Sequence, residues 1–252
     1  WDDIGIFVKY GMITEEKFYE KAKDIALLKN VEDKYFTLDE YRKHVEPNQT
    51  DKDKNVTFLY STDKGKQHTY IESAQNKGYD IISFDNIIDS HLINHLEQKL
   101  EKTQIKRVDS DTVDKLIDKE DKLESVLSKD EEDKVKGIFE TTANNSSMTI
   151  QVESMSPEEM PVTITMSEFM RRMKDMAATG GGMPMMGTMP DQYNVSVNAN
   201  HPITAKILKL KKKEDQQKLA KQALDLAMLS QNMLSGSDLT AFIKRSVSIA
   251  EN

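Results

Sequence analysis

Val56-Thr57-Phe58-Leu59-Tyr60 is a run of β-branched and aromatic residues, and two further runs of this kind follow it. A helical stretch up to about residue 77 separates it from Tyr79-Asp80-Ile81-Ile82-Ser83-Phe84. A second helical stretch, 87–100, precedes a third strand at 104–108. Strands that alternate with helices through short connections form right-handed crossovers and a largely parallel sheet. The stretch therefore predicts a small parallel α/β subdomain.

Two helices are predicted on the N-terminal side of this subdomain. Residues 13–29 predict one helix, with Thr14 as its N-cap and an apolar stripe that includes Phe18 and Leu28. The spacing of Thr37 and Glu40 is that of a capping box, which predicts a second, short helix. We expect residues 1–108 to form one domain.

Residues 109–134 are dense in Asp, Glu and Lys, which is typical of a solvated connector between domains. Beyond it, 147–153 and 162–165 alternate apolar and polar residues, which predicts two antiparallel partner strands. A further strand at 193–197 and three helices, about 202–210, 215–234 and 239–250, complete a second domain over 135–252. The fold class predicted for the whole chain is α+β, in which a small parallel α/β subdomain precedes a mixed α/β domain that ends in a helical pair.

Methionine is concentrated in one stretch, since eleven of the 14 methionines fall between Met148 and Met189. Its flexible, polarizable side chain suits surfaces that bind varied apolar partners. One apolar stripe recurs at helical spacing, and the triple glycine that begins at Gly180 ends the helix. The members of the stripe are Met166, Phe169, Met170, Met173 and Met176. Either this stripe is the core face of an amphipathic helix or it is a partly exposed binding surface.

The last two helices carry more apolar surface than an isolated pair can bury. On the first helix the apolar stripe includes Leu219, Ala223, Leu226 and Met233, and on the second it includes Leu239, Phe242, Ile243 and Val247. Two such helices from each of two chains make a four-helix bundle with two-fold symmetry. The pattern fits a homodimer interface and fits packing within one domain equally well.

The composition excludes several functional classes. The chain has no cysteine, which excludes disulfides and thiol catalysis and fits a reducing compartment. Its net charge of −8 argues against nucleic acid as a partner, and no apolar run is long enough to span a membrane. No glycine-rich phosphate loop follows any predicted strand, and Ser61-Thr62-Asp63-Lys64-Gly65-Lys66 is a poor substitute. No catalytic constellation is recognisable, so we expect no enzyme activity.

Metal binding is a weaker alternative. The thioethers of the methionine helix and of Met183, Met186 and Met189 have a spacing that a Cu(I) site could use. His91 and His95, four residues apart, could share a metal ion, but two ligands do not make a structural site. We expect no metal and no cofactor.

Several motifs, taken in order, resemble those of one protein family. They are Gly5-Ile6-Phe7-Val8-Lys9-Tyr10-Gly11, Thr37-Leu38-Asp39-Glu40-Tyr41, the strand from Val56 to Thr62, Gly78-Tyr79-Asp80-Ile81-Ile82, the segment from Asp85 to Asp89, and Val197-Asn198-Ala199-Asn200-His201-Pro202-Ile203. In the last of these, Ala199 replaces the proline usual in the family. Their order and spacing resemble the bacterial, HtpG-type branch of the heat shock protein 90 chaperone family, from the end of the middle domain through the C-terminal dimerization domain.

The resemblance implies a molecular chaperone that binds client proteins, the partly folded chains on which a chaperone acts. It implies that the methionine helix contacts clients together with Ser90, His91 and Asn94, where His91 replaces an aromatic residue of some relatives, and that the last two helices form a homodimer. ATP and Mg would bind upstream of Trp1, so the chain is expected to be a fragment without ATPase activity. The chain ends in Ala250-Glu251-Asn252 and lacks the acidic tail of the cytosolic eukaryotic relatives, so the resemblance favours a bacterial-type, cytoplasmic protein. A purely structural dimerization module remains the alternative.

Overall fold

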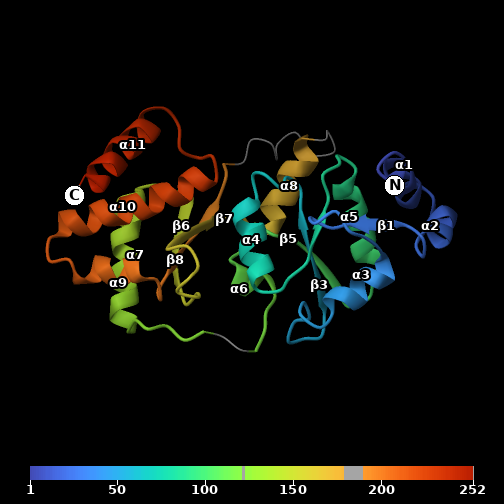
Figure 1. The fold of residues 1–252 in the computed structure, drawn as a ribbon, viewed down its shortest axis with the longest axis horizontal. Helices are drawn as coiled ribbons and strands as arrows, with labels where there is room; N and C mark the ends of the chain where they lie inside the picture. The colour runs from blue at the N-terminus through green and yellow to red at the C-terminus, as the bar shows by residue number, and fades with distance from the viewer. Residues whose placement is uncertain (121–122, 179–189, 252) are drawn as a thin grey trace. The chain divides into compact units, whose positions relative to one another are not determined.

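The computed structural model describes residues 1–120, 123–178 and 190–251, without the side chains of 175–178 and 250. The chain forms two compact units (Figure 1). The first unit comprises 1–120 and 168–189, and the second comprises 121–167 and 190–252. The helix that follows Ser167 thus belongs to the first unit, although the sequence places it within the domain predicted for 135–252.

The first unit is built on a three-stranded sheet in the order β4-β3-β5, with both pairs parallel. Every residue of the central strand is buried, as is usual where helices cover both faces of a parallel sheet. This arrangement confirms the parallel α/β subdomain. The elements of the unit are α1 (Gly5–Thr14), α2 (Glu16–Ala22), β1 (Leu27–Lys29), β2 (Tyr35–Thr37), α3 (Leu38–Val45), β3 (Val56–Ser61), α4 (His68–Asn76), β4 (Ile81–Ser83), α5 (Asp89–Lys99), β5 (Thr103–Arg107), α6 (Val113–Leu116) and α8 (Glu168–Ala178).

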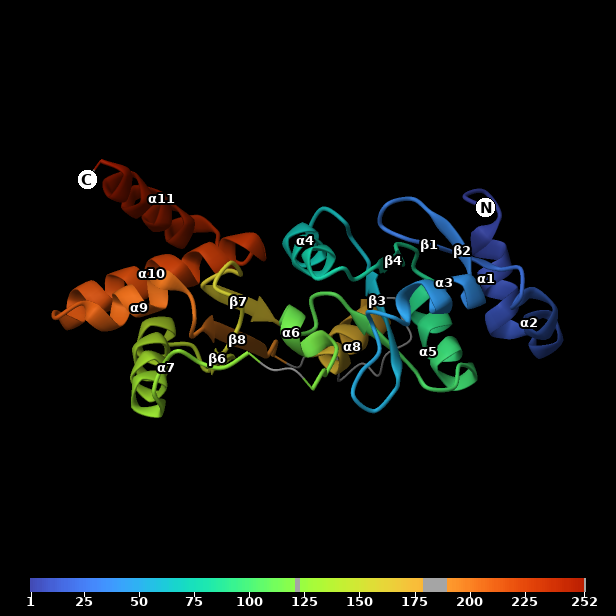
Figure 2. The ribbon, with the colours of Figure 1, turned by 60° about the horizontal axis from the view of Figure 1, so that its bottom comes forward.

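The prediction of one helix over 13–29 is wrong. The segment contains the end of α1, the separate helix α2 and strand β1, and α1 packs against α2 (Figure 2). Thr14 lies in the last turn of α1, where its hydroxyl donates to the Tyr10 carbonyl at 2.8 Å, and Glu15 caps α2 instead. The capping box of α3 is confirmed, because Thr37 N–H donates to Glu40 Oε2 at 2.8 Å while Glu40 N–H donates to Thr37 Oγ1.

An ion pair buried between α1 and α5 joins parts of the chain that are 80 residues apart. Lys9 Nζ lies 2.6 Å from Asp89 Oδ1, and the two side chains are 11% and 2% exposed. The Asp89 carboxylate also accepts the N–H of Asn86 at 3.0 Å, which fixes the first turn of α5. The pair therefore holds the first long helix of the chain against the sheet unit.

Removing one member of this pair should destabilise the first unit strongly. Lys9→Met leaves a buried carboxylate without its partner and is expected to lower the free energy of unfolding by about 3–5 kcal/mol. The double variant Lys9→Met/Asp89→Asn should recover part of this loss, because no uncompensated charge remains. Urea unfolding measures both, with the exposed Lys17→Met as the control. Losses that add in the double variant would contradict a coupled pair.

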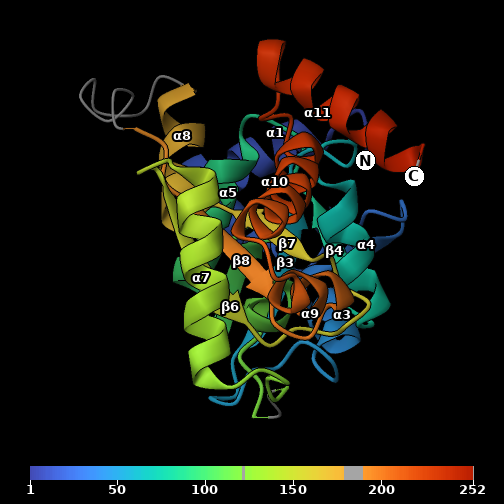
Figure 3. The ribbon, with the colours of Figure 1, turned by 90° about the vertical axis from the view of Figure 1, so that its left-hand side faces the viewer.

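The second unit has a mixed sheet in the order β6-β8-β7, in which β6 runs parallel and β7 antiparallel to β8. The predicted direct pairing of 147–153 with 162–165 is therefore wrong, because β8 lies between the two strands. Helix α7 packs against β6 and helix α10 against β7 (Figure 3). The elements of the unit are α7 (Lys129–Ala143), β6 (Met148–Glu153), β7 (Val162–Thr165), β8 (Tyr193–Asn198), α9 (Pro202–Lys209), α10 (Lys213–Ser230) and α11 (Gly236–Ala250).

The stretch predicted as a solvated connector, 109–134, differs from that expectation at both ends. Val113, Leu116 and Ile117 are buried in a core cluster of the first unit. Helix α7 begins at Lys129, where Ser128 and Glu131 form a capping box. Because most residues around these three are charged, the sequence pattern did not predict their burial. Among the described residues, each helix is too short or too polar to cross a lipid bilayer.

Candidate functional site

Helix α8 carries the methionine stripe, and it contacts the rest of the first unit through its polar face. Successive helical residues are 100° apart, so Glu168, Arg171 and Arg172 share one face, while Phe169 and Met173 lie on another. The Glu168 carboxylate accepts hydrogen bonds from the Tyr60 hydroxyl at 3.0 Å and from Arg107 N–H at 2.8 Å. The sequence places the charged residues opposite to the apolar stripe and leaves open which of the two faces is packed. In the structure, these charged residues anchor the helix.

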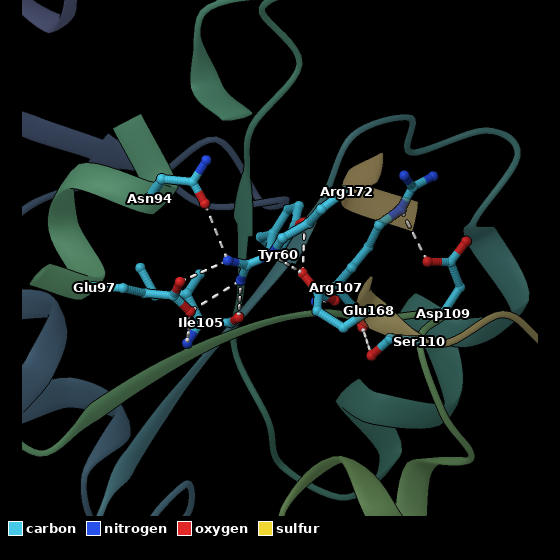
Figure 4. Close-up of polar contacts among 9 residues, drawn as sticks. All are labelled: Tyr60, Asn94, Glu97, Ile105, Arg107, Asp109, Ser110, Glu168 and Arg172. Atoms are coloured by element: carbon cyan, nitrogen blue, oxygen red, sulfur yellow. Dashed lines mark hydrogen bonds and ion pairs between the residues drawn. The ribbon is translucent and has the colours of Figure 1, made fainter. Parts of the chain in front are cut away.

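Arg172 is the centre of the anchor (Figure 4). Its guanidinium binds both carboxylate oxygens of Glu97, at 2.5 and 2.9 Å, and donates to the Ile105 carbonyl at 2.7 Å and to Asn94 Oδ1 at 3.3 Å. Its Nε donates to Glu168 at 2.7 Å. Bidentate guanidinium–carboxylate pairs are among the strongest polar contacts in proteins. One side chain therefore joins α8 to both α5 and β5.

The charges in this anchor balance each other. Arg171 lies 3.2 Å from Asp109, whose buried carboxylate also pairs with Arg107 at 2.9 Å. Burial alone lowers the pKa of Arg172, but its bonds to Glu97 and Glu168 outweigh burial and raise the pKa. Burial, with the nearby Glu168 charge, raises the pKa of Tyr60, so its hydroxyl stays protonated as a donor. Three arginines thus meet three carboxylates, and the cluster has no net charge.

The apolar stripe is only partly packed. Phe169 is 67% exposed, and Met170 and Met173 are half-buried. The side chain of Met176 and the segment from Gly180 to Met189 lie outside the described residues. Met166 is different, because it is 1% exposed and precedes α8 as part of the second unit. The structure therefore contradicts a surface role for Met166, which the helical spacing had included in the stripe.

The residues predicted on α5 are in three different environments. His91 is exposed and Ser90 is half-buried. Asn94 accepts a hydrogen bond from Arg172, so the structure brings this predicted position directly to α8. His95, on the same helix, packs edge-on against Tyr19, with ring centroids 4.9 Å apart. Within the described part of the chain, no three His, Asp or Glu side chains converge as a metal-ligand set.

The α10–α11 pair is held together by polar contacts. Asp225, which is 1% exposed, pairs with Arg245 of α11 at 2.6 Å and with Lys221, and Arg245 Nε donates to Gln222 at 2.6 Å. Several of the predicted interface residues are packed within the second unit. Ala223 is in its core, and Leu219 and Met233 pack against that core. Phe242 is 7% exposed and Leu239 is half-buried. Leu226, Ile243 and Val247 remain 45%, 52% and 52% exposed.

The loop after β3 is already closed by its own side chains. Gln67 Oε1 accepts from the N–H groups of Thr62 and Asp63, and Asp63 Oδ1 accepts from those of Gly65 and Lys66, all at 2.8–3.0 Å. A phosphate-binding loop presents such N–H groups to its ligand. In this loop the chain itself uses them, which agrees with the poor match of 61–66 to a phosphate loop.

A family model described as "Hsp90 protein" matches residues 1–250 of the chain. The chain belongs to the Hsp90 family. It is 34% identical to the chaperone protein htpG of Bacteroides fragilis strain YCH46 over 99% of this chain and 46% of that protein. It is 41% identical to the chaperone protein HtpG of Porphyromonas gingivalis strain ATCC 33277 over 91% of this chain and 34% of that protein. The chain thus spans less than half the length of these Hsp90 relatives.

The resemblance seen in the sequence motifs is therefore confirmed at the level of the family. The anchor of α8 had no such signal beyond the spacing of Glu168 and Arg172, which are four residues apart and bonded to each other. Glu97, Asn94 and Ile105 lie 67 to 78 residues from Arg172 in this Hsp90 chain. Sequence reasoning missed Glu97 and Arg172 because nothing local connects them.

Proposed function

We propose that this chain is the client-binding and dimerizing part of an Hsp90-family chaperone. Clients contact the apolar stripe of α8, represented by Phe169, Met170 and Met173, together with the exposed face of α5 at Ser90 and His91. Two copies associate through α10 and α11 and so present two client surfaces. ATP binding and hydrolysis belong to parts of the protein outside these 252 residues.

One observation carries the client-binding part of this proposal. Helix α8 is anchored through its charged face, so the side that carries Phe169 is not the anchored side. A core helix of a globular domain packs through its apolar stripe. The reversed arrangement, with the phenylalanine 67% exposed, supports a binding surface rather than a core element. Contacts of this kind are apolar and non-directional, which suits clients of varied sequence.

Avidity supports the dimeric part of the proposal. Each apolar contact with a partly folded chain is weak, but a client that touches both copies gains through effective concentration. The exposed Leu226, Ile243 and Val247 supply apolar surface for the association of two copies. The alternative, a purely structural dimerization module, uses the same helices but assigns no binding role to α8.

The variant Phe169→Ser/Met170→Gln/Met173→Gln should remain a folded dimer and hold clients poorly. We expect its ability to suppress aggregation of a heat-unfolded model protein to fall at least about tenfold, since each apolar side chain contributes roughly 1.5–3 kcal/mol when buried. Light scattering of the model protein measures this loss, and circular dichroism checks the fold. Met166 is left unchanged because it is a core residue.

A matched control removes exposed apolar groups elsewhere in the first unit. Phe7 and Ile25, which are 73% and 72% exposed, are replaced in Phe7→Ser/Ile25→Gln. This control should suppress aggregation as the wild-type chain does. If both variants lose the same activity, client binding is a general property of exposed apolar surface and not of α8. If neither loses activity, the structural dimerization module is the better description.

A further inference from the structure

A pocket of about 220 Å³ opens where the parallel strands β3 and β4 end, beside α5. Its walls are mostly apolar and come from Tyr60, Phe84, Ile87 and Ile93, and Ser90 and Arg172 also line it. In open parallel sheets the crevice at the carboxyl ends of the strands is the usual position of a ligand. The pocket lies within the first unit and is lined by residues of both α5 and α8. We name it the α5 pocket.

The charged groups inside the α5 pocket already have partners. Arg172 is neutralised by Glu97 and Glu168, and Asp89 is paired with Lys9 at 2.6 Å. No cation in the lining is therefore left for a phosphate group. The volume is also below the roughly 300–1,000 Å³ of pockets that hold drug-sized ligands. A nucleotide is a poor fit on both counts, whereas one apolar side chain matches the size and the chemistry.

The rim of the pocket is acidic. Asp85 is exposed, and its carboxylate accepts a hydrogen bond from Asn86 Nδ2 at 3.2 Å. Among the described residues, no Lys, Arg or His side chain lies within ion-pair distance of Asp85. Next to it, Ile87 is 79% exposed and extends the apolar wall to the surface. An occupant therefore meets apolar surface first and a carboxylate beside it.

We propose that the α5 pocket binds one apolar side chain of an extended client segment, with a neighbouring lysine or arginine of that segment paired to Asp85. This inference rests on the proposed client-binding function and names the sequence feature that the site selects. The apolar side chain fills the space between Phe84 and Ile93, and the adjacent cation lies at the rim. The pocket thereby adds a preference for apolar residues next to basic ones to the general apolar stripe of α8.

The test titrates a ¹⁵N-labelled chain with the peptide Gly-Ser-Gly-Phe-Lys-Gly-Ser-Gly and follows the amide signals of Asn86, Ile87 and Ser90. We expect saturable shifts with a dissociation constant in the millimolar range. The peptides with Phe→Ala or Lys→Glu should bind more weakly. Asp85→Lys should weaken binding of the Phe-Lys peptide about five- to tenfold, because reversing a surface charge replaces attraction by repulsion.

Ser90→Phe tests the pocket itself by filling it. It should abolish the shifts for every peptide, whereas Gln98→Phe, on an exposed part of α5 outside the pocket, should not. Asp53→Lys, an equally exposed charge reversal in the same unit, is the control for Asp85→Lys. Wild-type binding in both Asp85→Lys and Ser90→Phe, or no saturable binding to the wild-type chain, would overturn the inference.

The aggregation assay separates this inference from the function on which it rests. If the wild-type chain suppresses aggregation of the model protein but the pocket variants bind peptide normally, the chaperone proposal stands and the pocket assignment fails. If the wild-type chain suppresses no aggregation, the proposed function fails, whatever the peptide does. If both experiments succeed, Ser90→Phe should also reduce suppression of aggregation for clients rich in Phe-Lys and Leu-Arg pairs.

Discussion

Replacing Ile243 and Val247 by aspartate is expected to leave the chain folded but monomeric. Both side chains are 52% exposed and lie four residues apart on one face of α11. In a two-fold interface each substitution occurs twice. Burial of the exposed half of each side chain is worth roughly 1 kcal/mol, so four lost contacts raise the dissociation constant about 1,000-fold. Sedimentation equilibrium of Ile243→Asp/Val247→Asp over a range of concentrations measures this change.

The control for this experiment is Ile25→Asp, which places the same charge at an apolar position 72% exposed in the first unit. It should leave the dissociation constant of the proposed dimer unchanged. Circular dichroism should show that Ile243→Asp/Val247→Asp keeps α11, since the contacts of Arg245 with Asp225 and Gln222 are intact. A dimer of wild-type affinity in the double variant would show that α11 is not in the interface.

Arg172→Met should release α8 from the first unit. The substitution leaves both Glu97 and Glu168 without their guanidinium and the Ile105 carbonyl without its donor. The side chains of Arg172, Glu97 and Glu168 are 20–31% exposed. Breaking such a partly buried network costs about 3 kcal/mol. Hydrogen exchange of the amides in 168–178 should then become about 100-fold faster, because exchange reports local opening.

Two neighbouring variants make this prediction specific. Arg171→Met removes a single ion pair with Asp109, which keeps its contact with Arg107, so the exchange of α8 should change much less. Arg172→Lys keeps the charge but loses the bidentate geometry, so its effect should fall between the two. Equal exchange in all three variants and the wild-type chain would show that α8 is held by its apolar side and not by Arg172.

The sheet of the first unit could be predicted because its signals are local. β-rich runs and short connections determine the order of elements, and chain handedness then favours a parallel arrangement. The mixed sheet of the second unit could not, because two neighbouring alternating runs are normally partners. Here β8, buried from Val195 to Asn198, takes the central position between them. The position of β8 between β6 and β7 depends on pairing between residues far apart in the sequence, and no local sequence pattern predicts it.

The candidate site was predictable in part. The spacing of Phe169, Met170 and Met173 correctly predicts a helix with an apolar stripe. The face by which it docks was not predictable, since the spacing fits both a buried core face and an exposed binding surface. Arg172 of α8 binds groups of α5 and β5 that lie 67 to 78 residues earlier in the chain. Met166 was misplaced for a related reason, because helical spacing does not show that the helix begins two residues later, at Glu168.

The first unit consists of two separate segments of the chain, 1–120 and 168–189, so its parts are not synthesised in one continuous stretch. Tyr60 and its partner Glu168 are 108 residues apart, and strands β6 and β7 are made between them. At about 5–20 residues per second, roughly 5–20 s pass before α8 leaves the ribosome. During this interval β6 and β7 of the other unit are made. The acceptor groups of Glu97 and Ile105 do not yet have their donor, Arg172. The first unit therefore receives its last helix only after two strands of the second unit have been made, and before their shared partner β8 is made.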